Sequence, residues 1–148
     1  MRTILVAAEA KWVRDLVKSA CVASDQRVIE VARGQEVRDV VGSESPDVVI
    51  LDLQIENMGG IAVAIDLRLE GAAGRIPDTV VLLLLDREAD WFLAKRADAD
   101  FELVKPVDPG TLRRVVDRLL TAPVVETDDE PEPAVGDVST REAETVER

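Results

Sequence analysis

Short apolar runs alternate along the chain with segments in which apolar residues recur every three or four positions. The runs predict strands at residues 4–7, 27–31, 48–51, 79–84 and 102–104. Each run is followed by a segment with helical periodicity, and the first such segment has its apolar residues at positions 13, 16, 17, 20 and 21. This alternation predicts an α/β fold, with a parallel sheet covered by helices on both faces.

The later helices have recognisable ends. Gly59 and Gly60 precede the third helix, whose buried stripe we expect at Ile61, Ile65 and Leu69. A fourth helix is predicted at 89–97, and Asp108 is positioned to cap a fifth. The periodicity stops after residue 120. Residues 122–148 contain nine acidic residues and two arginines, so we expect a domain at 1–121 and an acidic disordered tail at 122–148.

The composition disfavours several classes of function. The chain has 148 residues and a net charge of −12, which disfavours binding to nucleic acid because a phosphate backbone demands a basic surface. No apolar run is long enough for a membrane helix. The lone cysteine, Cys21, cannot form an intrachain disulfide and fits the cytoplasm, and its place on the first helical stripe predicts a small core residue. The absence of histidine removes a common general base and zinc ligand.

Charged residues follow three of the predicted strands. Glu9 comes after the first strand, Asp52 after the third and Lys105 after the fifth. In open parallel sheets, ligands bind at the carboxyl ends of the strands near the change in strand order, so these three side chains are candidates to converge there. The alternative is that they are ordinary loop charges.

Two segments resemble the response-regulator receiver family. The first is ILDLQIENMGG at residues 50–60, and the second is ELVKP at residues 102–106. In that family an acceptor aspartate follows an apolar strand, a glycine lies eight residues on, and a Lys-Pro pair closes the fifth strand. Asp52, Gly60, Lys105 and Pro106 match this pattern. The resemblance covers residues 3–120 and implies a flavodoxin-like (βα)5 three-layer sandwich with strand order 2-1-3-4-5.

The resemblance also implies roles. Asp52 would be the phospho-acceptor, and Lys105 would contact the phosphoryl group as a point charge. Glu9, Asp52 and the carbonyl oxygen of Gln54 would hold a magnesium ion. The Lys105–Pro106 peptide bond would be cis. A sensor kinase or phosphotransfer protein would supply the phosphoryl group.

The sequence departs from the family at the positions that bind the metal and read the phosphate. Ala8-Glu9 replaces a pair of adjacent acids, so we expect magnesium binding to be weak or lost. Leu85 stands where a hydroxyl residue would hydrogen-bond the phosphoryl group, and Asp86 would repel that group if it pointed inward. Glu102 stands where a switching aromatic residue is usual.

Output is expected to come from protein contacts, because the resemblance includes no output domain. In receiver domains the fourth helix, fifth strand and fifth helix form a face that meets partners or a second copy. Trp91, Lys95 and Arg113 are the candidates on this face for a downstream protein or a homodimer. Trp12 lies off the apolar stripe of the first helix, near the strand ends.

Three functions therefore remain open, and the first two are not enzymes. The first is a single-domain response regulator that accepts a phosphoryl group on Asp52 and signals through protein contacts. The second is a degenerate pseudo-receiver that works as a phosphorylation-independent adaptor. The third is a small α/β enzyme or nucleotide-binding protein, which is disfavoured because neither GxGxxG nor GxxxxGK[ST] occurs.

Overall fold

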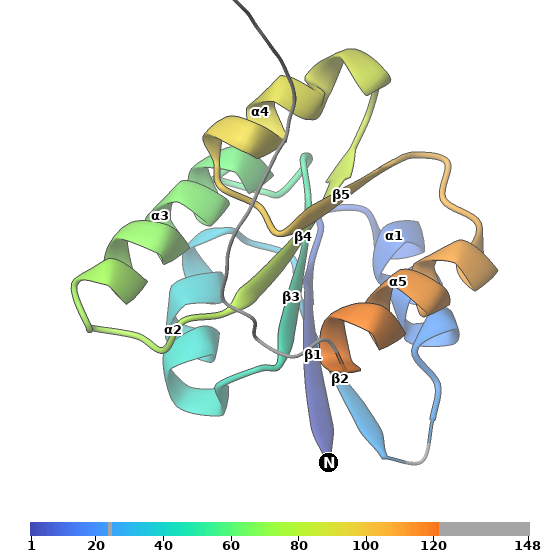
Figure 1. The fold of residues 1–148 in the computed structure, drawn as a ribbon, viewed down its shortest axis with the longest axis horizontal. Helices are drawn as coiled ribbons and strands as arrows, with labels where there is room; N and C mark the ends of the chain where they lie inside the picture. Colours follow the sequence, from blue (N-terminus) through green and yellow to red (C-terminus); the bar gives the residue numbers. More distant parts are fainter. Residues whose placement is uncertain (24, 122–148) are drawn as a thin grey trace, which may run out of the picture.

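A computed structural model describes residues 1–23 and 25–121 as five strands that alternate with five helices (Figure 1). The predicted tail at 122–148 lies outside the described residues. In chain order the elements are β1 (Arg2–Ala7), α1 (Lys11–Ala20), β2 (Gln26–Val31), α2 (Gln35–Glu44), β3 (Val48–Asp52), α3 (Gly60–Ala72), β4 (Val80–Leu85), the 3-10 turn η1 (Glu88–Asp90), α4 (Trp91–Arg96), β5 (Phe101–Val104) and α5 (Pro109–Thr121).

The strands form one parallel sheet in the order β2-β1-β3-β4-β5, as predicted. Helices α1 and α5 cover one face, and α2, α3 and α4 cover the other (Figure 1). The result is the three-layer flavodoxin-like sandwich. The second strand is added on one side of β1, and the later strands are added on the other side. The strand order therefore changes direction between β1 and β3, and side chains at the carboxyl ends of the strands can converge there.

Two hydrophobic cores follow from this arrangement, one on each face of the sheet. Alternate residues of each central strand point into opposite cores, and the residues of β3 are all buried. This burial on both faces explains why the strands read as continuous apolar runs. Cys21 belongs to the core beneath α1 and α5, as its helical stripe predicts. Among the described helices, none combines the length and apolar character needed to cross a membrane.

Two details of the sequence prediction were wrong. Helix α3 buries Val63, Ala64 and Leu67, whereas Ile65 and Leu69 of the predicted stripe are exposed. The helix is apolar on most sides, so periodicity alone did not decide which side faces the sheet. The fourth helical segment begins as a 3-10 turn, and its α-helix starts only at Trp91.

Candidate functional site

The carboxyl ends of the four adjacent strands β1, β3, β4 and β5 deliver the charged side chains of the candidate site. Asp52 is the last residue of β3, and Lys105 directly follows β5. Parallel pairing of β3 with β4 and of β4 with β5 brings these two ends to one edge of the sheet. The backbone N–H of Lys105 donates to the Leu85 carbonyl oxygen at 2.8 Å, which fixes where the lysine leaves the sheet.

Asp52 and Lys105 converge at this edge of the sheet, as their places after the strands predict, and they form an ion pair. The lysine Nζ donates a hydrogen bond to Asp52 Oδ1. The aspartate is 1% exposed and the lysine side chain 12% exposed, so the pair is largely shielded from water. A buried carboxylate requires such a partner, because desolvating an unpaired charge costs several kcal/mol, on the order of 3–5 when one partner is removed.

A second carboxylate shares the same lysine. Asp86, the first residue after β4, lies with its Oδ1 2.7 Å from Lys105 Nζ. Its other oxygen, Oδ2, accepts a hydrogen bond of 3.1 Å from the side-chain Nε2 of Gln54. Asp86 therefore points inward, the orientation in which the sequence analysis expected it to repel a phosphoryl group. A signal for it was available, because it follows a parallel strand just as Asp52 and Lys105 do.

The two carboxylates experience different environments. Burial raises the pKa of Asp52, and the Lys105 ammonium opposes this without cancelling it. Asp86 is 36% exposed, and its hydrogen bond from Lys105 lowers its pKa. Burial alone would lower the pKa of Lys105, but the two carboxylates raise it instead. The lysine is thus held as an ammonium between two carboxylates.

Gly60 explains one part of the sequence motif physically. Its backbone N–H donates to the Leu53 carbonyl oxygen at 3.1 Å, which brings the start of α3 against the end of β3. A Cβ at position 60 would lie 2.2 Å from the Asp52 carbonyl oxygen, closer than any side chain permits. The glycine eight residues after the aspartate therefore permits this close approach. The Lys105–Pro106 peptide bond is cis, as the resemblance implied.

The predicted metal ligands lie at the end of β3 and on the loops that follow β1 and β3. The backbone N–H of Glu9 donates to the Gln54 carbonyl oxygen at 2.9 Å, which joins the loops after β1 and β3. Asp52, the Gln54 carbonyl oxygen and the exposed Glu9 carboxylate are all oxygen donors, a set that suits a magnesium ion retaining several waters. The neighbouring Ala8 is fully buried and adds no donor. Within residues 1–23 and 25–121, no group of three His, Cys, Asp or Glu residues is arranged to hold a metal.

Arg14 supports the loop after β1, and no pattern in the sequence indicates this role. Its Nη1 donates to the carbonyl oxygens of Ala8 and Glu9, at 2.7 Å and 2.8 Å. Its Nε donates to Glu30 on β2 at 3.3 Å. The arginine therefore fixes the backbone that carries Glu9.

The positions that depart from the family pattern lie where the sequence placed them. Leu85 is fully buried at the end of β4 and offers no hydroxyl to the cleft. Glu102 is an exposed residue of β5, paired in register with Leu83. The structure thus has neither a hydroxyl nor an aromatic side chain at the two positions that would connect a phosphoryl group with the α4–β5 surface.

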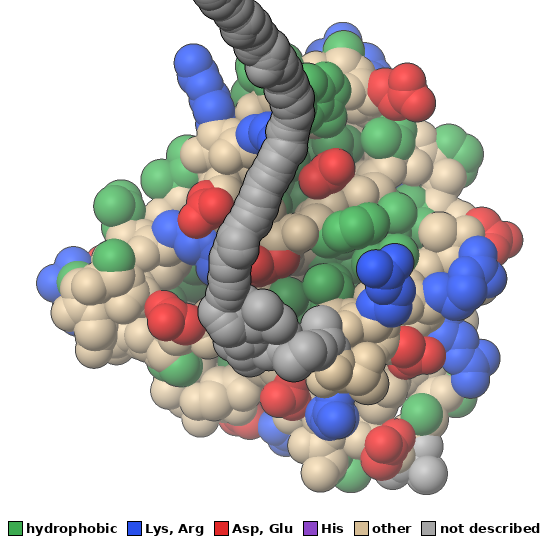
Figure 2. Space-filling model, viewed as in Figure 1, with side chains coloured by type: hydrophobic (Ala, Val, Ile, Leu, Met, Phe, Trp, Pro, Cys, Tyr) green, Lys and Arg blue, Asp and Glu red, His purple; other side chains and the backbone are tan. Residues whose placement is uncertain are grey.

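Exposed aromatic residues occupy the surface around α4 and β5. Trp91 is 52% exposed, and Lys95 Nζ lies 5.6 Å from the centroid of its ring. Phe92 and Phe101 are also exposed. Figure 2 shows hydrophobic side chains gathered over β5 and α5, among scattered charged ones. Trp12 is 58% exposed at the start of α1, off the buried stripe of that helix as predicted.

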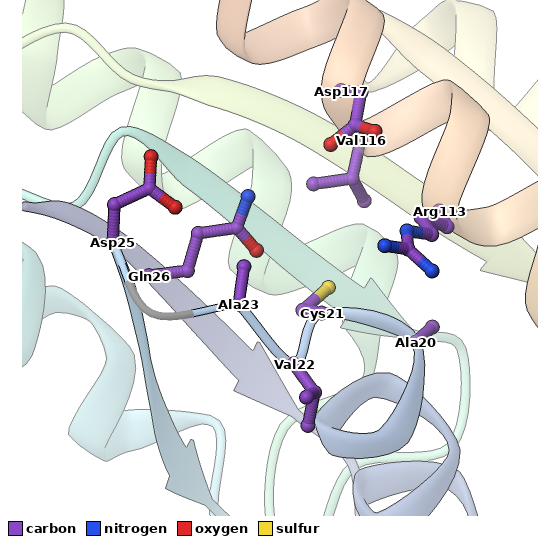
Figure 3. A pocket seen from close by; sticks show the side chains of 9 residues that line it. All are labelled: Ala20, Cys21, Val22, Ala23, Asp25, Gln26, Arg113, Val116 and Asp117. Atoms are coloured by element: carbon purple, nitrogen blue, oxygen red, sulfur yellow. The ribbon is translucent and has the colours of Figure 1, made fainter.

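Arg113 does not share this surface with Trp91 and Lys95. It lies on the side of α5 that faces α1, where it lines a hollow of about 260 Å³ near the amino end of β2. Figure 3 shows Arg113 and Asp117 reaching from α5 toward Cys21 and Gln26. The side of α5 that adjoins β5 is formed by Val115, Arg118 and Leu119.

Comparisons with known proteins agree with this geometry. A nitrate/nitrite response regulator protein homolog of Haemophilus influenzae is 34% identical over 101 residues, which are 68% of this chain and 47% of that protein. The chain thus spans about half the length of that relative. Protein PilH of Pseudomonas aeruginosa is 28% identical over 94 residues, which are 64% of this chain and 77% of PilH.

Two solved structures show the same fold. The receiver domain of a signal transduction histidine kinase from Syntrophus aciditrophicus has a TM-score of 0.71 at 22% identity, covering 88% of this chain and 98% of that one. CheY4 of Vibrio cholerae has a TM-score of 0.70 at 24% identity, covering 81% of this chain and 99% of that one.

A comparison with protein-family models identifies the family of the chain. The model for the response regulator receiver domain matches residues 4–117, which includes every strand end of the cleft. Receiver domains are signalling modules of two-component systems rather than classical enzymes, and they are phosphorylated by histidine kinases. This chain belongs to the response regulator receiver domain family.

Proposed function

We propose that this receiver domain accepts a phosphoryl group on Asp52 and passes the signal on through protein contacts in the cytoplasm. The observation that carries the proposal is the buried ion pair between Asp52 and Lys105 at the carboxyl edge of the sheet. Burial of a carboxylate that is 1% exposed has an unfavourable desolvation free energy. An apolar residue at this position would stabilise the fold as well or better, so a purely structural role does not explain the aspartate. A role of Asp52 as phospho-acceptor explains why the charged pair is present at this position.

The chemistry is a nucleophilic transfer. A carboxylate oxygen of Asp52 attacks the phosphorus of a phosphohistidine on a sensor kinase or phosphotransfer protein, and an O–P bond forms as the N–P bond breaks. The electron pair of the broken bond stays on the imidazole, which takes up a proton, and Asp52 becomes an acyl phosphate. Lys105 offers an ammonium to the phosphoryl oxygens. Glu9, Asp52 and the Gln54 carbonyl oxygen would hold the magnesium ion, which supplies positive charge to the transferring group.

The α4–β5 surface is the proposed site of output. Trp91 with Lys95 over its ring, together with the exposed Phe92 and Phe101, offers an aromatic surface for a downstream protein or for a second copy of the domain. Aromatic side chains of this kind supply most of the binding free energy in many protein interfaces.

Intact-mass measurement tests the proposal. The domain is incubated with magnesium and acetyl phosphate, beside the Asp52→Asn variant, which keeps the size of the side chain and removes its charge. We expect the mass of one phosphoryl group to be added to the wild-type domain and none to the variant. Equal gain in both, or no gain in the wild type, would contradict the acceptor role.

A second candidate function is favoured by one observation. Asp86 already supplies an anion to Lys105, and Leu85 offers no hydroxyl, so Lys105 is paired without a phosphoryl group. On this view the domain is a pseudo-receiver that binds its partner without phosphorylation. Binding of a partner by Asp52→Asn with unchanged affinity, together with no phosphoryl gain in the wild type, is the result expected of this adaptor.

A further inference from the structure

Asp86 occupies a position in the cleft that has consequences for phosphoryl transfer. Lys105 has three N–H donors, and it directs one at Asp52 and another at Asp86. A phosphoryl group on Asp52 that accepted a hydrogen bond from this lysine would lie beside the Asp86 carboxylate, because the two anions would share one ammonium. At separations of a few ångströms in a shielded cleft, two such anions repel each other strongly.

The Asp86 side chain is held in this position from two sides. Gln54 Nε2 donates to Asp86 Oδ2 at 3.1 Å, and Lys105 lies 2.7 Å from Oδ1. Both carboxylate oxygens therefore have a partner.

The burial of Asp52 also indicates that Asp86 must move before a phosphoryl group can be transferred. Asp52 is 1% exposed, so a phosphodonor reaches it only if something in the cleft moves. Lys105 and Asp86 are the ion-paired side chains above it, with exposures that rise from 12% to 36% toward the solvent. The more exposed Asp86 is the group that can move outward at least cost, once its two hydrogen bonds are released.

We infer that Asp86 is an internal anion of the phosphoryl site, and that phosphorylation of Asp52 proceeds by displacing it from Lys105. Asp86 is a positioning residue that sets the rate of phosphoryl transfer without taking part in the bond changes. This inference rests on the proposed acceptor role of Asp52. On this inference, the contacts of Asp86 with Gln54 and with Lys105 slow the phosphorylation of Asp52.

The test compares three variants with the wild type. Asp86→Asn keeps the shape of the side chain and removes its charge. Gln54→Ala leaves the backbone carbonyl in place and removes the side chain that orients Asp86. Glu88→Gln is the matched control, because it removes one negative charge from an exposed position of the same loop, and the described ion pairs of Lys105 do not include Glu88.

The measurement is the initial rate of phosphoryl gain by intact mass, with magnesium and acetyl phosphate, at several acetyl phosphate concentrations. We expect Asp86→Asn to raise the rate about fivefold, the scale on which a partly exposed ion pair acts, and Gln54→Ala to raise it by a smaller factor. Glu88→Gln should leave the rate unchanged. Thermal unfolding of each variant establishes that the fold is retained.

The outcomes separate this inference from the proposed function. A phosphoryl gain in the wild type that becomes faster in Asp86→Asn, but not in the Glu88→Gln control, supports the internal anion. Equal rates in the wild type and Asp86→Asn overturn it and leave the acceptor role of Asp52 standing. No gain in either protein overturns both. An equal rise in Asp86→Asn and Glu88→Gln overturns it as well, because general charge then explains the effect.

Discussion

Two regions of the molecule contrast in size and in chemistry. The hollow between α1 and α5 near the amino end of β2 has a volume of about 260 Å³ and is lined by exposed or neutral groups, with the buried Cys21 thiol at its base. The cleft at the carboxyl ends of the strands is lined by the side chains of Asp52, Asp86 and Lys105. It contains a nearly inaccessible carboxylate, an ammonium and a second carboxylate in direct contact.

The contrast teaches that volume is a poor guide to the site of this protein. A protein retains a buried charge against its desolvation cost only where neighbouring groups compensate it, and such places are enriched in function. The hollow has no comparable ion pair among its described lining residues.

Replacement of Lys105 should destabilise the domain far more than replacement of Arg113. In Lys105→Ala the Asp52 and Asp86 carboxylates lose their shared ammonium, so we expect the free energy of unfolding to fall by about 3 kcal/mol or more. Arg113→Ala removes an exposed cation beside the hollow, and its effect should stay within about 0.5 kcal/mol. Urea unfolding measures both. Similar losses in the two variants would remove the distinction between cleft and hollow.

The Cys21 thiol should be unreactive, although it lies at the hollow. Burial, helped by Asp117, raises its pKa from 9.0 to about 11. At pH 8 the thiolate fraction is then roughly a hundredfold lower than in the unfolded chain, and alkylation by iodoacetamide should be slower by at least that factor. The folded domain and the domain in urea are compared in the same buffer.

The same pKa shift has a consequence for stability. Between pH 9 and 11 the unfolded chain loses the thiol proton while the folded chain keeps it, so the free energy of unfolding should decrease with rising pH in this window. A cysteine that reacts equally fast in the folded and unfolded chain would contradict the burial of this thiol.

Alanine substitutions at Gly60 and at Gly42 should change the stability of the domain in opposite directions. In Gly60→Ala the new methyl group would meet the Asp52 carbonyl oxygen at 2.2 Å, so we expect a loss of about 2 kcal/mol and a disturbed acceptor. In Gly42→Ala, within α2, the nearest atom is the Ile76 Cγ2 at 3.8 Å, so the substitution should stabilise the domain by about 0.5–1 kcal/mol. Thermal unfolding distinguishes the two signs.

Much of the fold followed from the sequence alone. The parallel α/β fold was predicted correctly, because alternating apolar strands and helical segments leave few ways to connect a parallel sheet. The strand order 2-1-3-4-5, which brings Asp52 and Lys105 together, was implied by the family resemblance and is confirmed. The cis bond at Pro106 came from the family resemblance. The acidic tail at 122–148 and the functional roles of the site residues stay predictions.

The details that failed depend on side-chain geometry. The buried side of α3 could not be predicted because the helix is apolar on most sides. Arg113 was assigned to a face shared by the fourth helix, the fifth strand and the fifth helix, but it lies on the side of α5 that faces α1. The inward position of Asp86 depends on its rotamer and on the Gln54 side chain, which no spacing along the chain reveals. Local packing decided each of these.

The central claim is that Asp52 is the residue that accepts the phosphoryl group, and reductive trapping tests it most directly. After incubation with magnesium and acetyl phosphate, sodium borohydride converts an aspartyl phosphate into homoserine, and peptide mapping by mass spectrometry locates the change. We predict homoserine at position 52, with Asp86 unmodified. Homoserine at position 86, or at neither position in a domain that has gained phosphate, would contradict the account.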